Sequence, residues 1–373
     1  MKNILLIDDS ALMRRIVCDI IDKEPDLCIK DMAGDGFEAL QILKKKPIYQ
    51  LIILDINMPK MDGIDFLKKL HEETYNGIPL FQYQPVIIFS SYTKEGAELT
   101  LRCLELGAVD FIKKPTNMFA TRYKKFQSKF IRLITLAMES HQITTMQTDQ
   151  EEGSQVVPDS GNVSLLNNSN KNNNAERNGV LERKKKKLVA IACSTGGPNA
   201  LKHVIPLLPA NLNAPVVIVQ HMPFGFTQSL AERLDTLSAL SCKEATAGEK
   251  ILRGNVYVAQ GGQHMKVGKN SEIIYSDEPV REGVKPCANY MYESLQDSEF
   301  DEIICVVLTG MGADGRDGIK SLAEKKKIYV IAQSEPTCTV YGMPRSIVEA
   351  GLVNQIVDLD NIAQEIISKV GVR

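Results

Sequence analysis

The sequence predicts an α/β protein with two doubly wound, mainly parallel-sheet domains that are joined by a flexible linker. Short apolar runs of strand length alternate with helix-period segments in both halves of the chain. A polar stretch without such runs separates the two halves. The length of 373 residues agrees with this division, since single cores stop growing at about 250–300 residues. We therefore predict domains at residues 1–140 and 188–373, with the linker at 141–187.

The first domain alternates strand and helix candidates. The strands are expected at Ile4–Ile7, Ile29–Ala33 (the weakest pattern), Leu51–Leu54, Val86–Phe89 and Asp110–Ile112. The helices are expected at Ala11–Ile21 and Gly36–Leu43, and a further helical pattern from Phe119 to Met138 ends the domain. This alternation predicts a parallel sheet covered by helices.

The linker is rich in Asn, Ser, Gln, Asp and Gly, and it buries too little apolar surface to offset the entropy of ordering. It ends in the basic run Arg183–Lys187, which we interpret as a solvated linker end, because no aromatic or second basic cluster accompanies it. From Leu188 the alternation resumes. Strands are expected at Leu188–Ala192, Val216–Gln220, Val256–Ala259, Ile303–Thr309 and Ile328–Ala332, and helices at Pro198–Leu207, Thr227–Leu237, Gly315–Glu324 and Ser346–Ala350.

Composition limits the classes of partner. The formal net charge of −2 gives no overall basic field, so we expect no nucleic-acid partner. No apolar run approaches the length of a membrane span, and the N-terminus lacks the apolar core of a signal peptide. The eight cysteines are scattered without metal-ligand spacing, and we expect them to be reduced and mostly buried. We therefore expect a cytoplasmic protein that does not insert into membranes.

Polar side chains follow the strands of the first domain. Asp8 and Asp9 come after the first strand, Asp55 ends the third, and Ser90 and Lys114 follow the last two. The carboxyl ends of parallel strands meet at one edge of a sheet, so these groups are expected to converge. Clustered carboxylates need a cation, and oxygen ligands favour Mg²⁺. Any single aspartate could merely cap a helix, but the combination predicts a site where an aspartate accepts a phosphoryl group.

The motifs that carry this pattern are Ile7-Asp8-Asp9-Ser10, Leu54-Asp55 through Met58-Pro59, Met61-Asp62-Gly63, Phe89-Ser90 and Lys114-Pro115. With them, residues 1 to about 120 resemble the flavodoxin-like receiver domain of two-component response regulators. The resemblance implies that Asp55 is the phosphoacceptor and that Ser90 and Lys114 form the switch pair. It also implies that Asp9, Asp55 and the Asn57 carbonyl hold Mg²⁺, with Asp8 in support. The longer connection Tyr75–Gln84 is expected to alter only a surface loop.

A serine, a histidine and an aspartate mark the second domain. Ser194 lies in Cys193–Pro198, where a strand turns into a helix, and backbone N–H groups there, that of Thr195 first, could stabilise an oxyanion. By itself this turn could equally bind a phosphate or cap the helix. His221 directly follows a strand and is our first candidate for a base, with His264 as the second.

The orienting acid is expected after strand Ile303–Thr309. Asp314 and Asp317 both lie there, and position alone does not separate them. The order Ser, His, Asp and the lack of a G-x-S-x-G motif argue against an ordinary α/β-hydrolase.

The second domain resembles the Rossmann-like α/β catalytic domain of CheB-type protein-glutamate methylesterases of chemotaxis. The matching motifs are Cys193-Ser194-Thr195-Gly196-Gly197, Gln220-His221-Met222-Pro223, Gly225-Phe226-Thr227, Gly262 with His264-Met265, Leu308 through Gly315, and Tyr341 through Arg345. The resemblance implies Ser194 as nucleophile, His221 as base, Asp314 as the orienting acid and the Met311 backbone near the oxyanion. It implies no cofactor in this domain.

The implied activity is hydrolysis of glutamate methyl esters, and deamidation of glutamines, on chemoreceptors. Phosphorylation of Asp55 by the chemotaxis histidine kinase would activate it. One departure is Lys285-Pro286-Cys287, where the family usually has Arg-Pro-Ser, and another is Asn289 in place of an acidic residue. We expect this stretch to border the substrate. Cys193 replaces a usual small residue, which we interpret as a packing substitution. Two other hypotheses remain at this point, namely a phosphate- or nucleotide-binding output module and a non-catalytic adaptor.

Overall fold

The computed structural model describes residues 1–91, 93–115, 124, 126–139 and 185–373. The predicted linker at 141–187 lies outside the described residues except for its last three, and Lys187 already belongs to the first strand of the second domain. Of the helical pattern from Phe119 to Met138, the described part forms a helix through residues 126–139.

The N-terminal sheet has five parallel strands in the order β2-β1-β3-β6-β7. They are β1 Lys2–Ile7, β2 Leu27–Ala33, β3 Leu51–Asp55, β6 Val86–Ser90 and β7 Asp110–Lys113. The helices between them are α1 Ala11–Ile21, α2 Gly36–Lys45, α3 Gly63–Glu72 and α4 Lys94–Glu105. Every strand predicted for this domain is present, and the sheet is parallel as expected.

Polar side chains before the helices explain where they begin. The hydroxyl of Ser10, the carboxylates of Asp35 and Asp62, and the hydroxyl of Thr93 each accept a hydrogen bond from an amide three residues further on. The connection Tyr75–Gln84 contains a small hairpin, β4 Thr74–Tyr75 with β5 Ile78–Pro79, and a 3₁₀ turn at Leu80–Gln82. It follows α3 and contributes nothing to the carboxyl edge of the sheet, which agrees with the expected effect on a loop.

The C-terminal sheet has seven parallel strands in the order β10-β11-β9-β8-β14-β15-β16. They are β8 Lys187–Cys193, β9 Val216–Gln220, β10 Ser241–Glu244, β11 Asn255–Val258, β14 Glu302–Val307, β15 Lys327–Gln333 and β16 Gln355–Val357. An antiparallel hairpin, β12 His264–Val267 with β13 Ile273–Ser276, stands apart from this sheet. The helices are α6 Gly197–Val204, α7 Phe226–Leu237, α8 Ala288–Ser294, α9 Arg316–Ala323, α10 Gly342–Glu349 and α11 Leu359–Val370.

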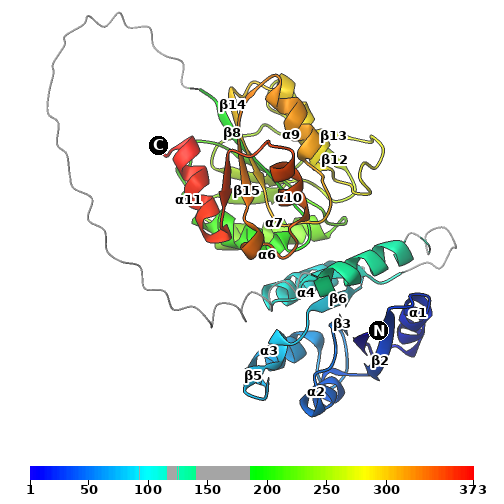
Figure 1. Cartoon of the computed structure of the whole chain (residues 1–373). Helices are drawn as coiled ribbons and strands as arrows, with labels where there is room; N and C mark the ends of the chain where they lie inside the picture. Colours follow the sequence, from blue (N-terminus) through cyan, green and yellow to red (C-terminus); the bar gives the residue numbers. More distant parts are fainter. Residues whose placement is uncertain (92, 116–123, 125, 140–184) are drawn as a thin grey trace, which may run out of the picture.

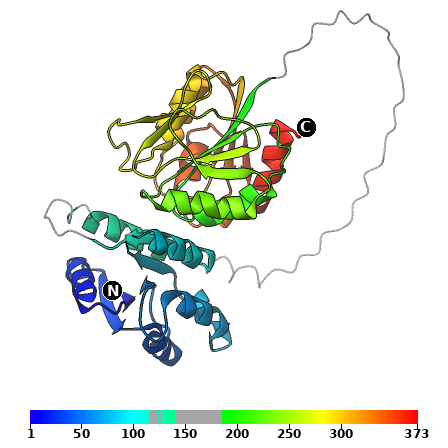
Figure 2. The same ribbon diagram turned by 180° about the vertical axis from the view of Figure 1, so that it is seen from behind.

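Helices cover both faces of this sheet, and the two domains meet on the side of α6 and α7 (Figures 1 and 2). There α4 of the N-terminal domain packs against both helices. None of the helices in the described ranges has the length and apolar character to cross a membrane.

Candidate active site and acidic pocket

The acidic pocket lies at the carboxyl edge of the N-terminal sheet. Asp8, Asp9 and Asp55 each offer a carboxylate oxygen, and these oxygens lie within 4.8 Å of one another. The Nζ of Lys114 lies 2.8 Å from Asp8 Oδ2 and 2.8 Å from Asp55 Oδ2. Because like charges at this distance repel, the all-oxygen set fits a hard divalent cation such as Mg²⁺. The structure thus brings together four of the six residues expected here.

The other two expected residues, Asn57 and Ser90, make no bond to these carboxylates among the described residues. Asn57 is exposed, two residues beyond Asp55. The Ser90 hydroxyl is fully buried and shares a 2.6 Å hydrogen bond with the Thr100 hydroxyl of α4, so it is engaged away from Asp55. Burial raises the pKa of Asp55 to about 6, although the neighbouring Lys114 opposes this effect.

Ser194 stands directly after β8, in a turn that is held from three sides. Its amide donates to the Thr309 carbonyl at 3.0 Å, and the buried Gln220 side chain donates to its carbonyl at 2.9 Å. Gly310 packs so closely that a Cβ there would lie 2.8 Å from Ser194 Cβ, which explains a glycine at that position. The turn therefore places the serine rigidly at the edge of the sheet.

Cys193 points the other way. It is fully buried, its thiol lies 3.0 Å from Gln220 Oε1, and burial raises its pKa above the ordinary value. A buried protonated thiol is a poor nucleophile, so the structure supports the interpretation of Cys193 as a packing residue.

His221 and Asp314 form a buried pair, with Nε2 of the imidazole 2.7 Å from Asp314 Oδ2. The other ring nitrogen, Nδ1, is buried and has no hydrogen-bond partner in the described part of the chain. The His221 amide donates to the Cys193 carbonyl at 3.1 Å, which ties the histidine to the serine turn. No hydrogen bond joins Ser194 Oγ to this ring among the described residues, and such bonds often tighten only when substrate binds.

The two alternative site residues are placed elsewhere. Asp317 is half exposed and pairs with Arg316 and Arg281, so Asp314 is the acid that reaches a histidine. His264 is fully buried, and its ring lies against that of Tyr290 with centroids 4.7 Å apart, without a bond to Asp314 among the described residues. The geometry therefore favours His221 as the base.

Two backbone amides complete the set. Thr195 follows the serine, and Met311 lies in the loop after β14. Neither amide donates to another group in the parts of the chain that the structure describes. Both remain available to a developing oxyanion.

Two residues of the stretch that was expected to border the substrate, Cys287 and Asn289, lie inside the fold instead of at the surface. Both residues are fully buried behind the pair, at the start of α8. The Cys287 thiol and the Asn289 amide lie at 3.0 and 2.9 Å from Asp314 Oδ1, while the Ala288 amide lies 2.6 Å from Oδ2. The Asn289 side chain accepts from the amides of Gly315 and Gly318. No sequence motif marked this support, because α8 was not predicted.

These contacts govern the charge of Asp314. Burial would raise its pKa, but the hydrogen bonds and charge of His221 together with the donors of α8 lower it below the ordinary range. Asp314 is therefore held as a carboxylate against the imidazole.

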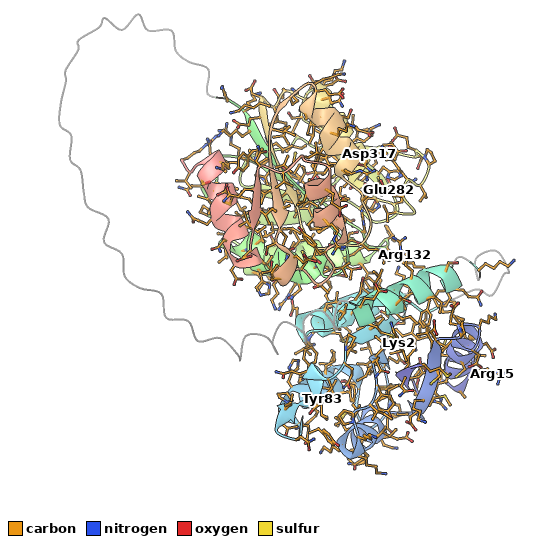
Figure 3. The ribbon with its side chains drawn as sticks, viewed as in Figure 1. Lys2, Arg15, Tyr83, Arg132, Glu282 and Asp317 are labelled. Carbon is orange, nitrogen blue, oxygen red and sulfur yellow. The ribbon has the colours of Figure 1, made fainter. Side chains whose placement is uncertain are left out.

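The N-terminal domain contacts all three loops of this site. The Thr195 hydroxyl donates to the Asp110 carboxylate, and Lys113 donates to the Phe224 carbonyl near His221 at 3.3 Å. Arg132 points at the loop of Met311, where its guanidinium lies 3.8 Å from the position of a Cβ on Gly312 (Figure 3). The contact between the domains thus covers the surroundings of Ser194, His221 and Met311 together.

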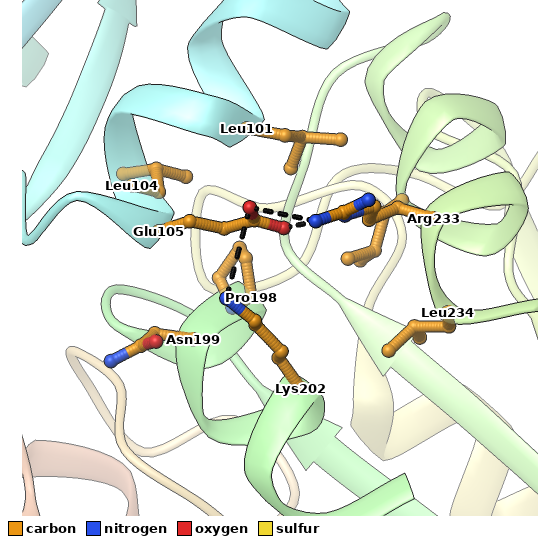
Figure 4. A pocket seen from close by; sticks show the side chains of 9 residues that line it. Leu101, Leu104, Glu105, Pro198, Asn199, Lys202, Arg233 and Leu234 are labelled. Carbon is orange, nitrogen blue, oxygen red and sulfur yellow. Dashed lines mark hydrogen bonds and ion pairs between the residues drawn. The ribbon is translucent and has the colours of Figure 1, made fainter. Parts of the chain in front are cut away.

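Apolar and ionic contacts widen this interface. The rings of Phe111 and Phe226 stack with centroids 4.6 Å apart. Beside them, a small pocket between α4, α6 and α7 holds Glu105, which binds Arg233 at 2.7 and 3.0 Å and lies 3.7 Å from Lys202 (Figure 4).

Comparison with known proteins decides the family. The CheB methylesterase family model matches residues 189–366, and the response regulator receiver domain model matches residues 4–121. A protein-glutamate methylesterase/protein-glutamine glutaminase of Syntrophomonas wolfei is 39% identical, over 98% of this chain and 99% of its own. The chain belongs to the CheB methylesterase family. It is a hydrolase, a chemotaxis methylesterase/glutaminase of the CheB type that carries a receiver domain.

A second full-length relative and one solved structure of a single domain are also similar to this chain. The Bacillus subtilis protein-glutamate methylesterase/protein-glutamine glutaminase is 38% identical, over 99% of this chain and 98% of its own. A crystal structure of the Thermotoga maritima CheB methylesterase catalytic domain is 38% identical, covers 50% of this chain and 99% of that chain, and has a TM-score of 0.48.

Proposed function

We propose that this CheB-family chain hydrolyses glutamate methyl esters and deamidates glutamines on chemoreceptors, with Ser194 as nucleophile, His221 as base and Asp314 as the orienting acid. The observation that carries the proposal is the buried His221–Asp314 pair. The backbone amide of this histidine donates a hydrogen bond to the carbonyl of Cys193, the residue before Ser194. We further propose that residues 1–140 form the regulatory domain and residues 188–373 the catalytic domain of a cytoplasmic protein, with residues 141–187 as the linker.

The geometry suggests how the reaction proceeds. Because Asp314 binds Nε2, Nδ1 is the ring nitrogen that takes the Ser194 proton. The serine oxygen attacks the ester carbonyl, and the amides of Thr195 and Met311 stabilise the oxyanion. His221 then returns the proton to the departing oxygen, which releases methanol, or to the departing nitrogen of a glutamine, which releases ammonia. Water hydrolyses the acyl-enzyme through the same histidine.

Methanol release from methylated receptor membranes tests this proposal. Replacing the nucleophile in Ser194→Ala is expected to lower turnover by at least about 10³-fold, because the oxyanion donors alone supply only residual catalysis. Ser368→Ala, at an exposed serine of α11, serves as a matched control. Turnover of Ser194→Ala near that of the wild type would exclude the serine mechanism.

A phosphate-binding turn is the alternative that the local sequence allows, and labelling separates it from an esterase. An activated serine reacts with a fluorophosphonate, whereas a serine that only cradles an anion does not. We expect the label on Ser194, and His221→Ala should abolish labelling because the base is lost. A non-catalytic adaptor would lack such reactivity altogether.

The acidic pocket supports control by phosphorylation. We propose that the chemotaxis histidine kinase phosphorylates Asp55, that Asp9, Asp55 and the Asn57 carbonyl hold Mg²⁺, and that Asp8 supports them. The ion would neutralise charge on the transferring phosphoryl oxygens. Lys114 already binds Asp8 and Asp55, and Ser90 would have to leave Thr100 to serve with it as the switch pair.

The domain contact supports inhibition by occlusion. Residues of β7 and of the helix through 126–139 cover the loops of Ser194, His221 and Met311, and β7 continues directly into Lys114 of the acidic pocket. A phosphoryl group on Asp55 adds about −1.5 to −2 charge next to Lys114, which would loosen the contact. A chain that begins at residue 185 should therefore exceed the unphosphorylated full chain in methanol release. Equal or lower release would contradict occlusion.

A further inference from the structure

The carboxylate of Asp314 receives two donors on each oxygen. His221 Nε2 and the Ala288 amide approach Oδ2, while the Cys287 thiol and the Asn289 amide approach Oδ1. The two amides belong to the backbone of α8 and stay in place whatever the side chain. Within the described residues, the Cys287 thiol is thus the one side-chain donor to Asp314 apart from His221.

Cys287 has the properties of a hydrogen-bond donor and not of a reactive thiol. It is fully buried, with its Sγ 3.0 Å from Asp314 Oδ1. Burial and the neighbouring carboxylate raise its pKa above the ordinary value, so it keeps its proton. The S–H group therefore faces Oδ1 as a donor, although a weaker one than a hydroxyl would be.

We propose that Cys287 is a positioning residue for the esterase reaction. Its thiol holds Oδ1 of Asp314 so that Oδ2 faces His221, and it sets how much negative charge the carboxylate keeps for the imidazolium that forms during catalysis. The inference rests on the proposed roles of Ser194, His221 and Asp314, and it adds a residue that touches none of the reacting atoms.

The donor strength at position 287 has a consequence with a definite sign. A hydroxyl would withdraw more charge from Asp314, which weakens its attraction for a protonated His221. An alanine would withdraw none, which strengthens that attraction. The acid limb of the pH–rate profile reports this protonation. It is therefore expected to move to lower pH in Cys287→Ser and to higher pH in Cys287→Ala.

Apart from residue 287 itself, neither substitution replaces a group that contacts Asp314. The groups in direct contact are His221, which follows β9, and the start of α8. His264 and Tyr292 lie farther away, within electrostatic range. None of these groups is altered by either substitution at position 287.

The test compares full-length proteins in methanol release from methylated receptor membranes between about pH 5 and about pH 9. The two Cys287 variants should displace the acid limb of kcat/KM in opposite directions, each by about 0.3–1 pH unit. Cys287→Ala should also lower kcat by about three- to tenfold, because one hydrogen bond to a charged group is lost. Cys305→Ala is the matched control, since Cys305 is equally buried, lies on β14 and makes no hydrogen bond to Asp314.

A nuclear magnetic resonance titration of the His221 ring in the same proteins gives a second readout that needs no turnover. The positioning role would be overturned if the acid limb of kcat/KM lay at the same pH in the wild type and in both Cys287 variants, and if the His221 ring also titrated at the same pH in all three proteins. An equal shift in Cys305→Ala would also overturn it. Failure of the proposed function has a different signature, since Ser194→Ala would then retain activity while the ring titrations could still separate Cys287→Ser from Cys287→Ala.

Discussion

The two sites occupy the same place in similar folds, yet they are held in different ways. In the acidic pocket, Asp8, Asp55 and Lys114 lie at or next to the end of a strand, and direct ion pairs hold them together. Of the three residues of the proposed active site, Ser194 and His221 directly follow a strand. Asp314 lies in a loop well beyond β14 and depends on donors from α8.

The difference shows what each type of site requires. A site of opposite charges needs only that strand ends converge, because coulombic attraction tolerates small displacements. A site of hydrogen bonds needs directed donors at fixed distances, so a second element must bring them. We therefore expect the active site to be sensitive to residues far from the reacting atoms, and the acidic pocket to be sensitive mainly to its own charges.

The largest effect is expected at Asp314, because this carboxylate accepts the hydrogen bonds from His221 and from the start of α8. In Asp314→Asn, one carboxylate oxygen becomes an NH₂ group, which cannot accept a hydrogen bond from His221 or from the amides of α8. At least one of these bonds is lost, so the His221 ring loses its orientation. Turnover should fall by about 10³–10⁴-fold in a methanol-release assay. Asp317→Asn, three residues further along, is the matched control and should leave turnover within about twofold, because its carboxylate contacts only exposed or half-buried arginines. Equal losses in both variants would contradict the assignment of Asp314.

The second effect concerns the charged site. Asp55→Asn keeps the shape of the side chain but removes the proposed phosphoacceptor, so a small-molecule phosphodonor should no longer stimulate methanol release. Unstimulated release should change little, because the substitution lies outside the esterase site. Stimulation that survives in this variant would show that another group accepts the phosphoryl group.

This contrast also explains which features were predictable from the sequence. All strands that carry Asp8, Asp55, Ser194 and His221 have apolar runs that are buried on both faces of a sheet, and such runs are recognisable. The edge strands β10 and β16 are short and partly polar, so they were missed. Helix α8 begins at Ala288, and Cys287 before it gives no side-chain cap. The link of this segment to Asp314 is a tertiary contact that no local pattern encodes.

The contact between the domains was unpredictable for the same reason. Asp110 was recognised only as the start of a strand, whereas the structure places its carboxylate on the Thr195 hydroxyl. Burial raises the pKa of Asp110 above its ordinary value, although Thr195 and the Phe111 amide oppose this effect. A partner from another domain is invisible to periodicity, which reports only the face that a strand presents.

A third prediction tests the support of the active site from a distance. The Asn289 side chain accepts from Gly315 and Gly318 and donates to Glu282 at 3.0 Å. In Asn289→Asp, the carboxylate keeps the first two bonds but faces the Glu282 carboxylate, and like charges repel. Turnover should fall by about three- to tenfold. The double variant with Glu282→Gln should recover most of this turnover, since the glutamine amide can donate a hydrogen bond to the new carboxylate at position 289. If turnover did not recover, repulsion between residues 282 and 289 would not be the cause of the loss.

The smallest effect is expected at the rim of the domain contact. Glu105 bridges to Arg233 and Lys202 and forms no bond with a described residue of either site, so Glu105→Ala weakens the contact without removing a group from either chemistry. Exposed ion pairs contribute little, and we expect unphosphorylated methanol release to rise only about two- to fivefold. Raising the salt concentration should reduce the difference between the variant and the wild type, because screening weakens the same pairs. Glu72→Ala removes a more exposed Glu–Lys pair with Lys69 within α3, outside the domain contact, and should leave release unchanged. If Glu105→Ala instead matched Glu72→Ala, the ionic rim would have no part in holding the domains together, and the stacked rings of Phe111 and Phe226 would be left as the main source of the proposed inhibitory contact.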